Sequence, residues 1–231
     1  IGKYKFKKLP LIGDRIALLD QAHYTMVKTS FFNGVKIPSI ALWDSETDDI
    51  DIINGQSTIA YEIYQELKPD FISGGLISGI SNYSKEYNQD CKIIGVESKG
   101  AESLQLALND GKPSIVKNVN TFVDGASVPQ VGNIPFDICK NNVDKLYSVD
   151  NKRVCHDIIN CYQDDGIILE PAGALPIGCL EEIKSDYDLK DKNVVIVLSG
   201  GNNDVTRYNE IMQLNLEYMG LIHFFIMEFN Q

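Results

Sequence analysis

Short apolar runs alternate with helix-length amphipathic segments through most of this 231-residue chain, and this alternation limits the possible folds more than any other feature. Asn193–Leu198 (Asn-Val-Val-Ile-Val-Leu) is the clearest buried strand, and Lys92–Glu97 is a second. Continuous β-branched runs are typical of strands that are covered on both faces. The pattern therefore predicts an α/β fold with a parallel or mixed sheet and flanking helices.

The first predicted helix follows residue 56. Ser57 or Thr58 is its expected cap, its apolar face is Ile59, Ala60, Ile63 and Leu67, and Pro69 ends it. Further helices are expected at Leu76–Tyr87, Ala101–Leu108, Lys152–Tyr162, Ala172–Ile183 and from Asp204 to about Tyr218. Leu146–Val149 and the terminal run Leu221–Phe229 are expected to be strands.

Composition excludes several classes of function. The chain has 21 basic and 32 acidic residues, a net charge of −11, which argues against nucleic-acid or anionic-membrane partners because both need a basic surface. No apolar run approaches the roughly 18–20 residues of a membrane helix. The five cysteines form no CxxC pair and the three histidines have no zinc-ligand spacing. These observations predict a cytoplasmic protein with reduced thiols.

Two glycine-rich turns stand where ligands bind in parallel sheets. Ser73-Gly74-Gly75 comes just before the helix at Leu76, and Ser199-Gly200-Gly201 directly follows the strand at 193–198. Glycines let the backbone approach an anion, and the N-terminus of a helix favours a phosphate group. The Ser199 hydroxyl is able to hydrogen-bond an anion or a ring nitrogen. Taken singly, each motif is more often a plain turn than a ligand site.

Two more motifs contain polar groups near predicted turns. Glu170-Pro171-Ala172-Gly173-Ala174 places a carboxylate just before a helix, where negative charge is favourable for structural reasons alone. Asp124-Gly125-Ala126-Ser127 is a polar loop, which alone predicts only a turn. The order of these motifs along the chain is more specific than any one of them.

In that order the motifs resemble the pyridoxal-phosphate-dependent threonine dehydratases (threonine ammonia-lyases), which are relatives of serine dehydratases and serine racemases. The resemblance rests on Asn54–Ala60, Gly74–Ile80, Ile93–Glu97, Phe122–Val128, Glu170–Ala174 and Val197–Asp204. It implies the fold-type II architecture of pyridoxal-phosphate enzymes, which is similar to the tryptophan synthase β subunit, with an N-terminal part missing.

The resemblance also implies roles for individual residues. Ser73, Gly74, Gly75 and Leu76 would bind the phosphate of the cofactor. Ser199, with Gly200 beside it, would face the pyridine nitrogen, and Gly125 and Glu170 would line the cofactor cavity. A hydroxyl partner leaves the pyridine ring neutral, which suits β-elimination.

The implied activity is that of a lyase of isoleucine biosynthesis, which converts L-threonine to 2-oxobutanoate and ammonia. Two alternatives stay open: a serine dehydratase or serine racemase, and a non-catalytic remnant of the same fold. L-serine therefore remains a candidate substrate beside L-threonine.

The family lysine that forms the Schiff base with the cofactor is absent. Ser30-Phe31-Phe32-Asn33-Gly34 resembles its motif, but Phe32 stands where the lysine belongs. The upstream loop that holds the substrate carboxylate is missing as well, so a further family segment is expected to precede this chain. No catalytic residue is assigned, and the isolated chain is expected to be inactive.

A cation site, divalent or monovalent, is a weaker implication of the resemblance. Glu97 and the carbonyl group of Ala101 match two ligands of metal-binding relatives, but Ser103 replaces the acid that would be the third. One hard oxygen ligand fewer weakens a Mg²⁺ site, so a monovalent ion is at least as plausible.

The resemblance divides the chain in two. Residues 1–218 would be a partial catalytic domain, and residues 219–231 would be the first strand of an ACT-like regulatory domain. This ending favours the allosteric biosynthetic enzyme, although the sequence leaves regulation by isoleucine open. By analogy we expect a homo-oligomer. Exposed Phe224, Phe225 and Phe229 on an unpaired strand would also promote association with other chains.

Overall fold

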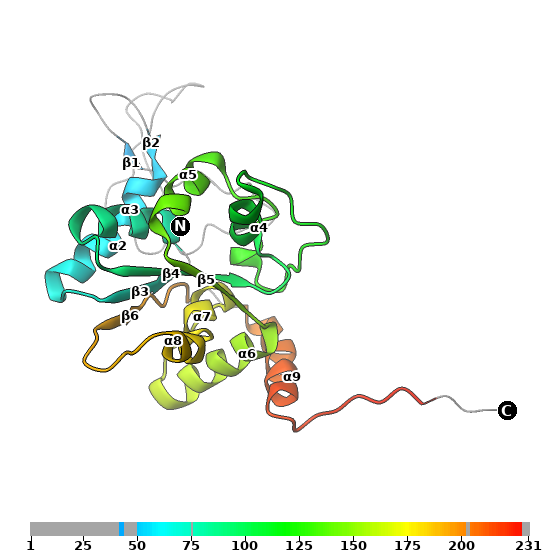
Figure 1. Cartoon of the computed structure of the whole chain (residues 1–231). Coiled ribbons are helices and arrows are strands. Elements are labelled where there is room, and N and C mark those ends of the chain that lie inside the picture. The colour runs from blue at the N-terminus through cyan, green and yellow to red at the C-terminus, as the bar shows by residue number, and fades with distance from the viewer. Residues whose placement is uncertain (1–41, 44–49, 75, 202–203, 228–231) are drawn as a thin grey trace, which may run out of the picture. The chain divides into compact units, whose positions relative to one another are not determined.

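The computed structural model describes residues 42–43, 50–74, 76–201 and 204–227. The contacts divide the chain into Ile1–Ser39 and Ile40–Gln231, and all described residues belong to the second unit. This unit is built on a four-stranded sheet in the order β5-β4-β3-β6 (Figure 1). Every pair of neighbours is parallel, which confirms the predicted α/β class.

The strands of this sheet are β3 (Phe71–Gly74), β4 (Lys92–Ser98), β5 (Lys145–Val149) and β6 (Val194–Ile196). A separate antiparallel pair consists of β1 (Leu42–Trp43) and β2 (Ile50–Asp51).

One face of the sheet is covered by α2 (Ile52–Glu66) and α3 (Ile77–Tyr87). Their buried apolar residues form a cluster with the strands: Ala60, Tyr64, Ile72, Ile80, Cys91 and Ile93. The predicted cap at Ser57 or Thr58 is wrong, because α2 begins at Ile52. Inside the helix, the Ser57 hydroxyl lies 3.0 Å from the carbonyl oxygen of Ile53 and 2.8 Å from that of Gly79, and its one hydrogen is shared between these acceptors on α2 and α3.

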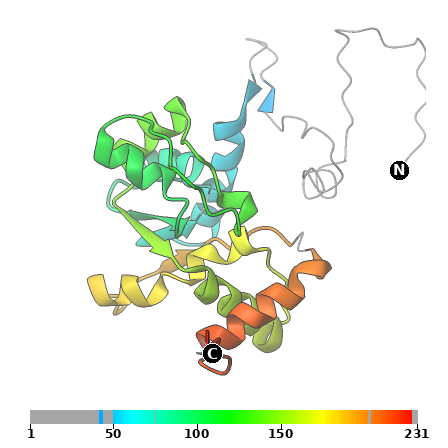
Figure 2. The ribbon, with the colours of Figure 1, turned by 90° about the vertical axis from the view of Figure 1, so that its right-hand side faces the viewer.

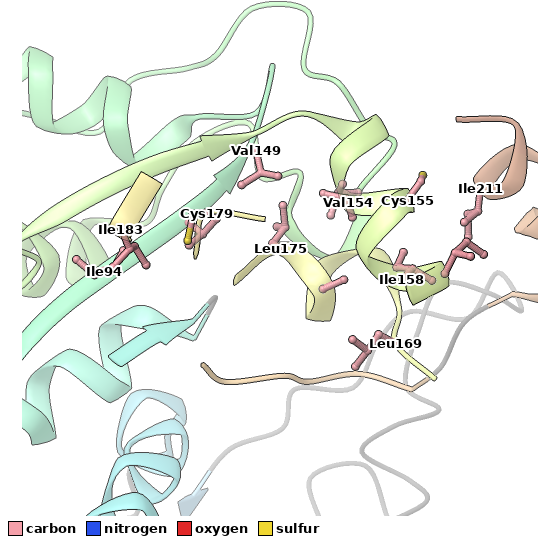
Figure 3. Packing of buried hydrophobic residues seen from close by; sticks show 14 of the residues in the cluster. Ile94, Val149, Val154, Cys155, Ile158, Leu169, Leu175, Cys179, Ile183 and Ile211 are labelled. Carbon is pink, nitrogen blue, oxygen red and sulfur yellow. The ribbon is translucent and has the colours of Figure 1, made fainter. Parts of the chain in front are cut away.

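The opposite face is covered by α6 (Asn151–Asn160), α7 (Pro171–Ala174), α8 (Leu180–Asp186) and α9 (Tyr208–Tyr218). Figures 1 and 2 both place α9 on the same side of the sheet as α6. Figure 3 shows the core that these elements share, with Val154, Leu175 and Ile211 pointing into it. Two more helices, α4 (Ser103–Asp110) and α5 (Asn133–Asn142), complete the described layers.

The predicted helix at 172–183 is wrong as a single element. It is divided into α7, a 3-10 turn at Leu175–Ile177 and α8. Pro176 lacks the N–H that would continue the helix. Gly178 packs so closely on β5 that a Cβ there would lie 2.4 Å from Val149 Cγ1. The break therefore lets this segment follow the surface of the sheet.

The predicted helix at 152–162 ends earlier, at Asn160, and a π-helical turn continues it from Cys161 to Asp165. The predicted helix from 204 starts as a 3-10 turn, Val205–Arg207, and becomes α9 only at Tyr208. All five cysteines are free thiols, as expected. Among the described residues, no helix combines the length and the apolar character needed to cross a membrane.

The segment Leu221–Met227 forms neither helix nor strand and leads away from α9 (Figure 1). Phe224 and Phe225 are exposed there. A lone strand needs a neighbour for its backbone hydrogen bonds. That residues 219–231 begin an ACT-like domain therefore stays a prediction.

Candidate functional site

The carboxyl ends of β3 and β6 meet at one cavity of about 1020 Å³. Ser73 pairs with Ile196 in the parallel register, so Gly74 lies beside Val197 and close to Ser199. A Cβ on Gly74 would lie 3.1 Å from Val197 Cβ. Of the predicted cofactor residues, the cavity is lined by Gly74, Leu76, Gly125, Glu170 and Ser199. Gly75 lies outside the described residues.

The N-terminus of α3 opens on this cavity. Leu76 is its N-cap and makes no side-chain capping hydrogen bond. The first helical bond runs from the N–H of Ile80 to the carbonyl oxygen of Leu76, so the N–H groups of residues 77–79 precede the helical ladder. Such groups, together with the helix dipole, favour an anion.

Ser73 does not face the cavity. Successive side chains of a strand point to opposite faces, so Ser73 and the cavity-lining Gly74 point apart. The Ser73 hydroxyl is buried 3.8 Å from Cys179 Sγ, and the Ser73 carbonyl oxygen accepts the N–H of Val197 at 2.9 Å. In the structure its role is to join β3 to the segment that ends in Ser199.

The Glu170 turn and the Ser199 turn are held together through their backbones. The Glu170 N–H donates to the carbonyl oxygen of Gly200 at 2.7 Å. Gly200 has φ +71°, and a Cβ there would lie 2.2 Å from Glu170 Cδ. Only glycine fits at this position, because both the left-handed backbone and the neighbouring carboxylate exclude a side chain.

Gly173 was missed as a site residue. A Cβ on Gly173 would lie 1.3 Å from the backbone oxygen of Ser199, so α7 packs directly against the backbone of the serine. The Glu-Pro-Ala-Gly-Ala motif contained this signal, but the sequence analysis assigned a role only to its carboxylate.

Gly125 completes this wall of the cavity from a 3-10 turn, Asp124–Ala126. A Cβ on Gly125 would lie 2.9 Å from Ala172 Cβ and 3.7 Å from Glu170 Oε1. Burial, and then repulsion from Asp124, raise the pKa of Glu170 above its ordinary value. Within the described part of the chain, no Lys or Arg forms an ion pair with Glu170. The site therefore holds a half-buried carboxyl group beside the Ser199 turn.

The predicted cation ligands already have hydrogen-bond partners. The two carboxylate oxygens of Glu97 accept the N–H groups of Leu104 (2.8 Å) and Gln105 (2.9 Å) at the start of α4. The carbonyl oxygen of Ala101 accepts the N–H of Ser103 at 2.9 Å. Burial raises the pKa of Glu97 in spite of these bonds. The described residues contain no cluster of three or more metal-ligand side chains, and the cation site stays a prediction.

A parallel sheet with helices on both faces, and a cavity where a glycine turn and a serine turn follow neighbouring strands, is the arrangement of a ligand-binding α/β protein. The chain belongs to the pyridoxal-phosphate dependent enzyme family, whose model matches residues 39–200.

Curated relatives agree with this assignment. The chain is 42% identical over 195 residues to the "L-threonine dehydratase biosynthetic IlvA" of Staphylococcus aureus (strain bovine RF122 / ET3-1), covering 80% of this chain and 46% of the relative. It is 40% identical over 194 residues to the protein of the same name from Lactococcus lactis subsp. lactis (strain IL1403), with the same two coverages. The chain thus spans about half the length of these relatives.

Solved structures share the fold. The processed form of threonine deaminase isoform 2 from Solanum lycopersicum matches with a TM-score of 0.66 and 33% identity, over 74% of this chain and 54% of that one. Serine racemase from Dictyostelium discoideum matches with a TM-score of 0.60 and 30% identity, over 68% and 52%.

The residues present fit the family cofactor, pyridoxal phosphate. The cavity offers helix N–H groups at one strand end and a hydroxyl group at the next. Because Gly200 and Gly173 have no Cβ, the Ser199 turn packs directly against Glu170 and α7. The lysine that binds the cofactor covalently in the family has no counterpart in a recognisable motif of this chain.

Proposed function

We propose that this chain is part of a threonine ammonia-lyase, which converts L-threonine to 2-oxobutanoate and ammonia in isoleucine biosynthesis. The observation that carries the proposal is the meeting of Gly74 and Ser199 at one cavity, with Glu170 beside them. The similarity to curated biosynthetic threonine dehydratases supports the same substrate.

In this proposal the chain supplies most of the non-covalent binding of the cofactor. Gly74, Leu76 and the first N–H groups of α3 would bind the phosphate. The Ser199 hydroxyl would hydrogen-bond the pyridine nitrogen, a neutral partner that leaves the ring uncharged. Gly125 and Glu170 would form a wall of the cofactor site. Pyridoxal phosphate, when bound, supplies the electron-withdrawing ring that stabilises negative charge at the substrate Cα.

The Schiff-base lysine and the loop for the substrate carboxylate would come from another part of the whole protein. We also propose that the whole protein is a cytoplasmic homo-oligomer. The exposed apolar residues of Leu221–Met227 support association, because a monomer rarely leaves such residues uncovered.

The test uses the natural gene product that contains these residues. We expect it to bind pyridoxal phosphate and to release 2-oxobutanoate from L-threonine faster than pyruvate from L-serine. Ser199→Ala should lower kcat at least about tenfold, because the proposed hydrogen bond to the pyridine nitrogen of the cofactor is lost. Ser114→Ala, which removes an exposed hydroxyl that bonds only the carbonyl oxygen of Lys112, is the matched control.

Each alternative function corresponds to a different result. Faster turnover of L-serine to pyruvate would identify a serine dehydratase, and formation of D-serine a serine racemase. A gene product that binds no pyridoxal phosphate would support the non-catalytic remnant and contradict the proposal.

A further inference from the structure

Arg207 connects the start of α9 to the loop that contains Gly125. Its Nη2 donates to the carbonyl oxygen of Phe122 at 2.8 Å, and its guanidinium carbon lies 4.8 Å from the centre of the Phe122 ring. Its Nη1 lies 3.7 Å from Asp124 Oδ1. A planar guanidinium is suited to such combined bonding and stacking, whereas a lysine ammonium is not.

The loop that Arg207 contacts has little regular structure, so its conformation depends on a few individual contacts. The Ser127 hydroxyl is within hydrogen-bond distance of the carbonyl oxygens of Asn120 (2.7 Å) and Val123 (2.6 Å), and the Val123 side chain is fully buried. These contacts fix the loop from within. Arg207 adds polar contacts from the start of α9 to this loop, because it binds both Phe122 and Asp124.

Arg207 also follows closely on the Ser199 turn. The Asp204 carboxylate accepts the N–H of Thr206 at 2.9 Å, and the Asp204 carbonyl oxygen accepts the N–H of Arg207 at 2.9 Å. One short segment thus contains the end of the Ser199 turn and the side chain that reaches the Gly125 loop.

Charge gives the contact a second consequence. Asp124 repels Glu170 and contributes to the raised pKa of the Glu170 carboxyl group. The guanidinium of Arg207 lies 3.7 Å from Asp124 Oδ1 and 3.6 Å from Glu210 Oε2. Its positive charge therefore offsets part of the negative charge of both carboxylates. Without Arg207, less positive charge would offset the repulsion of Glu170 by Asp124.

We propose that Arg207 is a positioning residue, which holds the Phe122–Ser127 loop so that Gly125 and Glu170 keep their places in the wall of the cofactor cavity. Arg207 does not line the cavity itself. The effect on cofactor binding rests on the proposed function, but the effect on the loop does not.

The first experiment measures hydrogen exchange of the peptide 120–128 in the natural gene product without added cofactor. Arg207→Gln should speed its exchange about tenfold, which is the loss expected for one hydrogen bond from a charged group. Arg207→Lys should restore only part of the protection. Lys152→Gln is the control, because Lys152 makes a 3.1 Å ion pair between α6 and Glu217 of α9 and lies outside the cavity. Equal exchange in Arg207→Gln and Lys152→Gln would overturn the proposal.

The second experiment measures the affinity of the natural gene product for pyridoxal phosphate by calorimetry. Arg207→Gln should weaken binding about tenfold, Arg207→Lys less, and Lys152→Gln not at all. A loosened loop with unchanged affinity would overturn the positioning role. If the unmutated gene product binds no cofactor, the proposed function fails, whereas the exchange result still decides whether Arg207 holds the loop.

Discussion

The carboxylates at the two ends of the parallel sheet differ in their ion pairing and in the direction of their pKa shifts. At the amino end, carboxylates are paired with lysines and backbone N–H groups, and their pKa values are lowered. At the carboxyl end, Glu97 and Glu170 are half-buried without an ion pair to any described residue, and their pKa values are raised. Glu97 accepts only backbone N–H groups, those of Leu104 and Gln105. Ion pairs therefore stabilise the carboxylates of the amino end, whereas burial disfavours the charge of these two at the carboxyl end.

Asp144 shows the arrangement at the amino end. Its carboxylate accepts Lys85 Nζ (2.7 Å), Lys92 Nζ (2.8 Å) and the N–H of Ile93 (2.9 Å), which joins α3, β4 and the start of β5. Burial alone would raise the pKa of Asp144, but the Ile93 N–H and the two lysines outweigh burial and lower it. Asp70 is similar, because the N–H of Asn193 and the Lys192 ammonium lower its pKa.

The largest expected effect is at the carboxyl end. Gly173→Ala should lower the free energy of unfolding by about 3 kcal/mol or more, because the new Cβ would lie 1.3 Å from the Ser199 backbone oxygen and no rotamer relieves a backbone clash. Chemical denaturation measures the loss. The matched control is Gly111→Ala, where a Cβ meets nothing within 4 Å and only φ +70° costs about 1 kcal/mol. Equal losses in the two variants would contradict the packing of α7 on Ser199.

A smaller loss is expected at the amino end. Asp144→Asn should lower the free energy of unfolding at neutral pH by about 1 kcal/mol, since the amide attracts the two lysines less and accepts fewer hydrogen bonds. The lowered pKa means that this stabilisation is complete above the ordinary value of 3.8 and is lost as pH falls through the lower pKa of the folded state. Asp137→Asn, in an exposed pair with Lys140 on α5, should change stability by less than about 0.5 kcal/mol. A pH-independent gap between wild type and Asp144→Asn would be inconsistent with this account.

The smallest effect should have the opposite sign. Glu170→Gln should raise the free energy of unfolding at neutral pH by about 0.5 kcal/mol, because it removes a half-buried charge that burial and Asp124 disfavour, and solvent screening keeps the gain small. The pKa of Glu170 is raised, so wild type regains this stability as pH falls through that pKa and the two proteins converge in acid. A destabilised Glu170→Gln variant would show that the carboxylate has a stabilising partner after all.

The sequence predicted the face of the sheet that is built from local segments. The cluster on α2 and α3 draws all its buried residues from 60–93, so periodicity within a short window located α3. In this window the start of α2 was misplaced and the strand β3 was missed. The opposite face joins residues from Phe71 to Ile211, and there the helix predicted at 172–183 proved to be broken. Close packing of Gly178 on Val149 is a long-range contact, and no local pattern reports it.

The site was predicted unevenly for a similar reason. In the structure, Gly74, Gly125, Glu170 and Ser199, which the order of the motifs had singled out, line one cavity. Motif order did not distinguish the strand position of Ser73 from a turn position, because β3 was not recognised as a strand. Gly173 and Arg207 were missed, since each acts on a backbone segment that only the fold brings near it. The roles of all these residues toward the cofactor remain predictions.

A crystal structure of the natural gene product grown with pyridoxal phosphate would test the central claim most directly. We predict the cofactor phosphate within hydrogen-bond distance of the backbone N–H groups at the start of α3, and the pyridine nitrogen facing the Ser199 hydroxyl. A cofactor bound elsewhere, or one whose ring nitrogen meets a charged group in place of Ser199, would contradict the account.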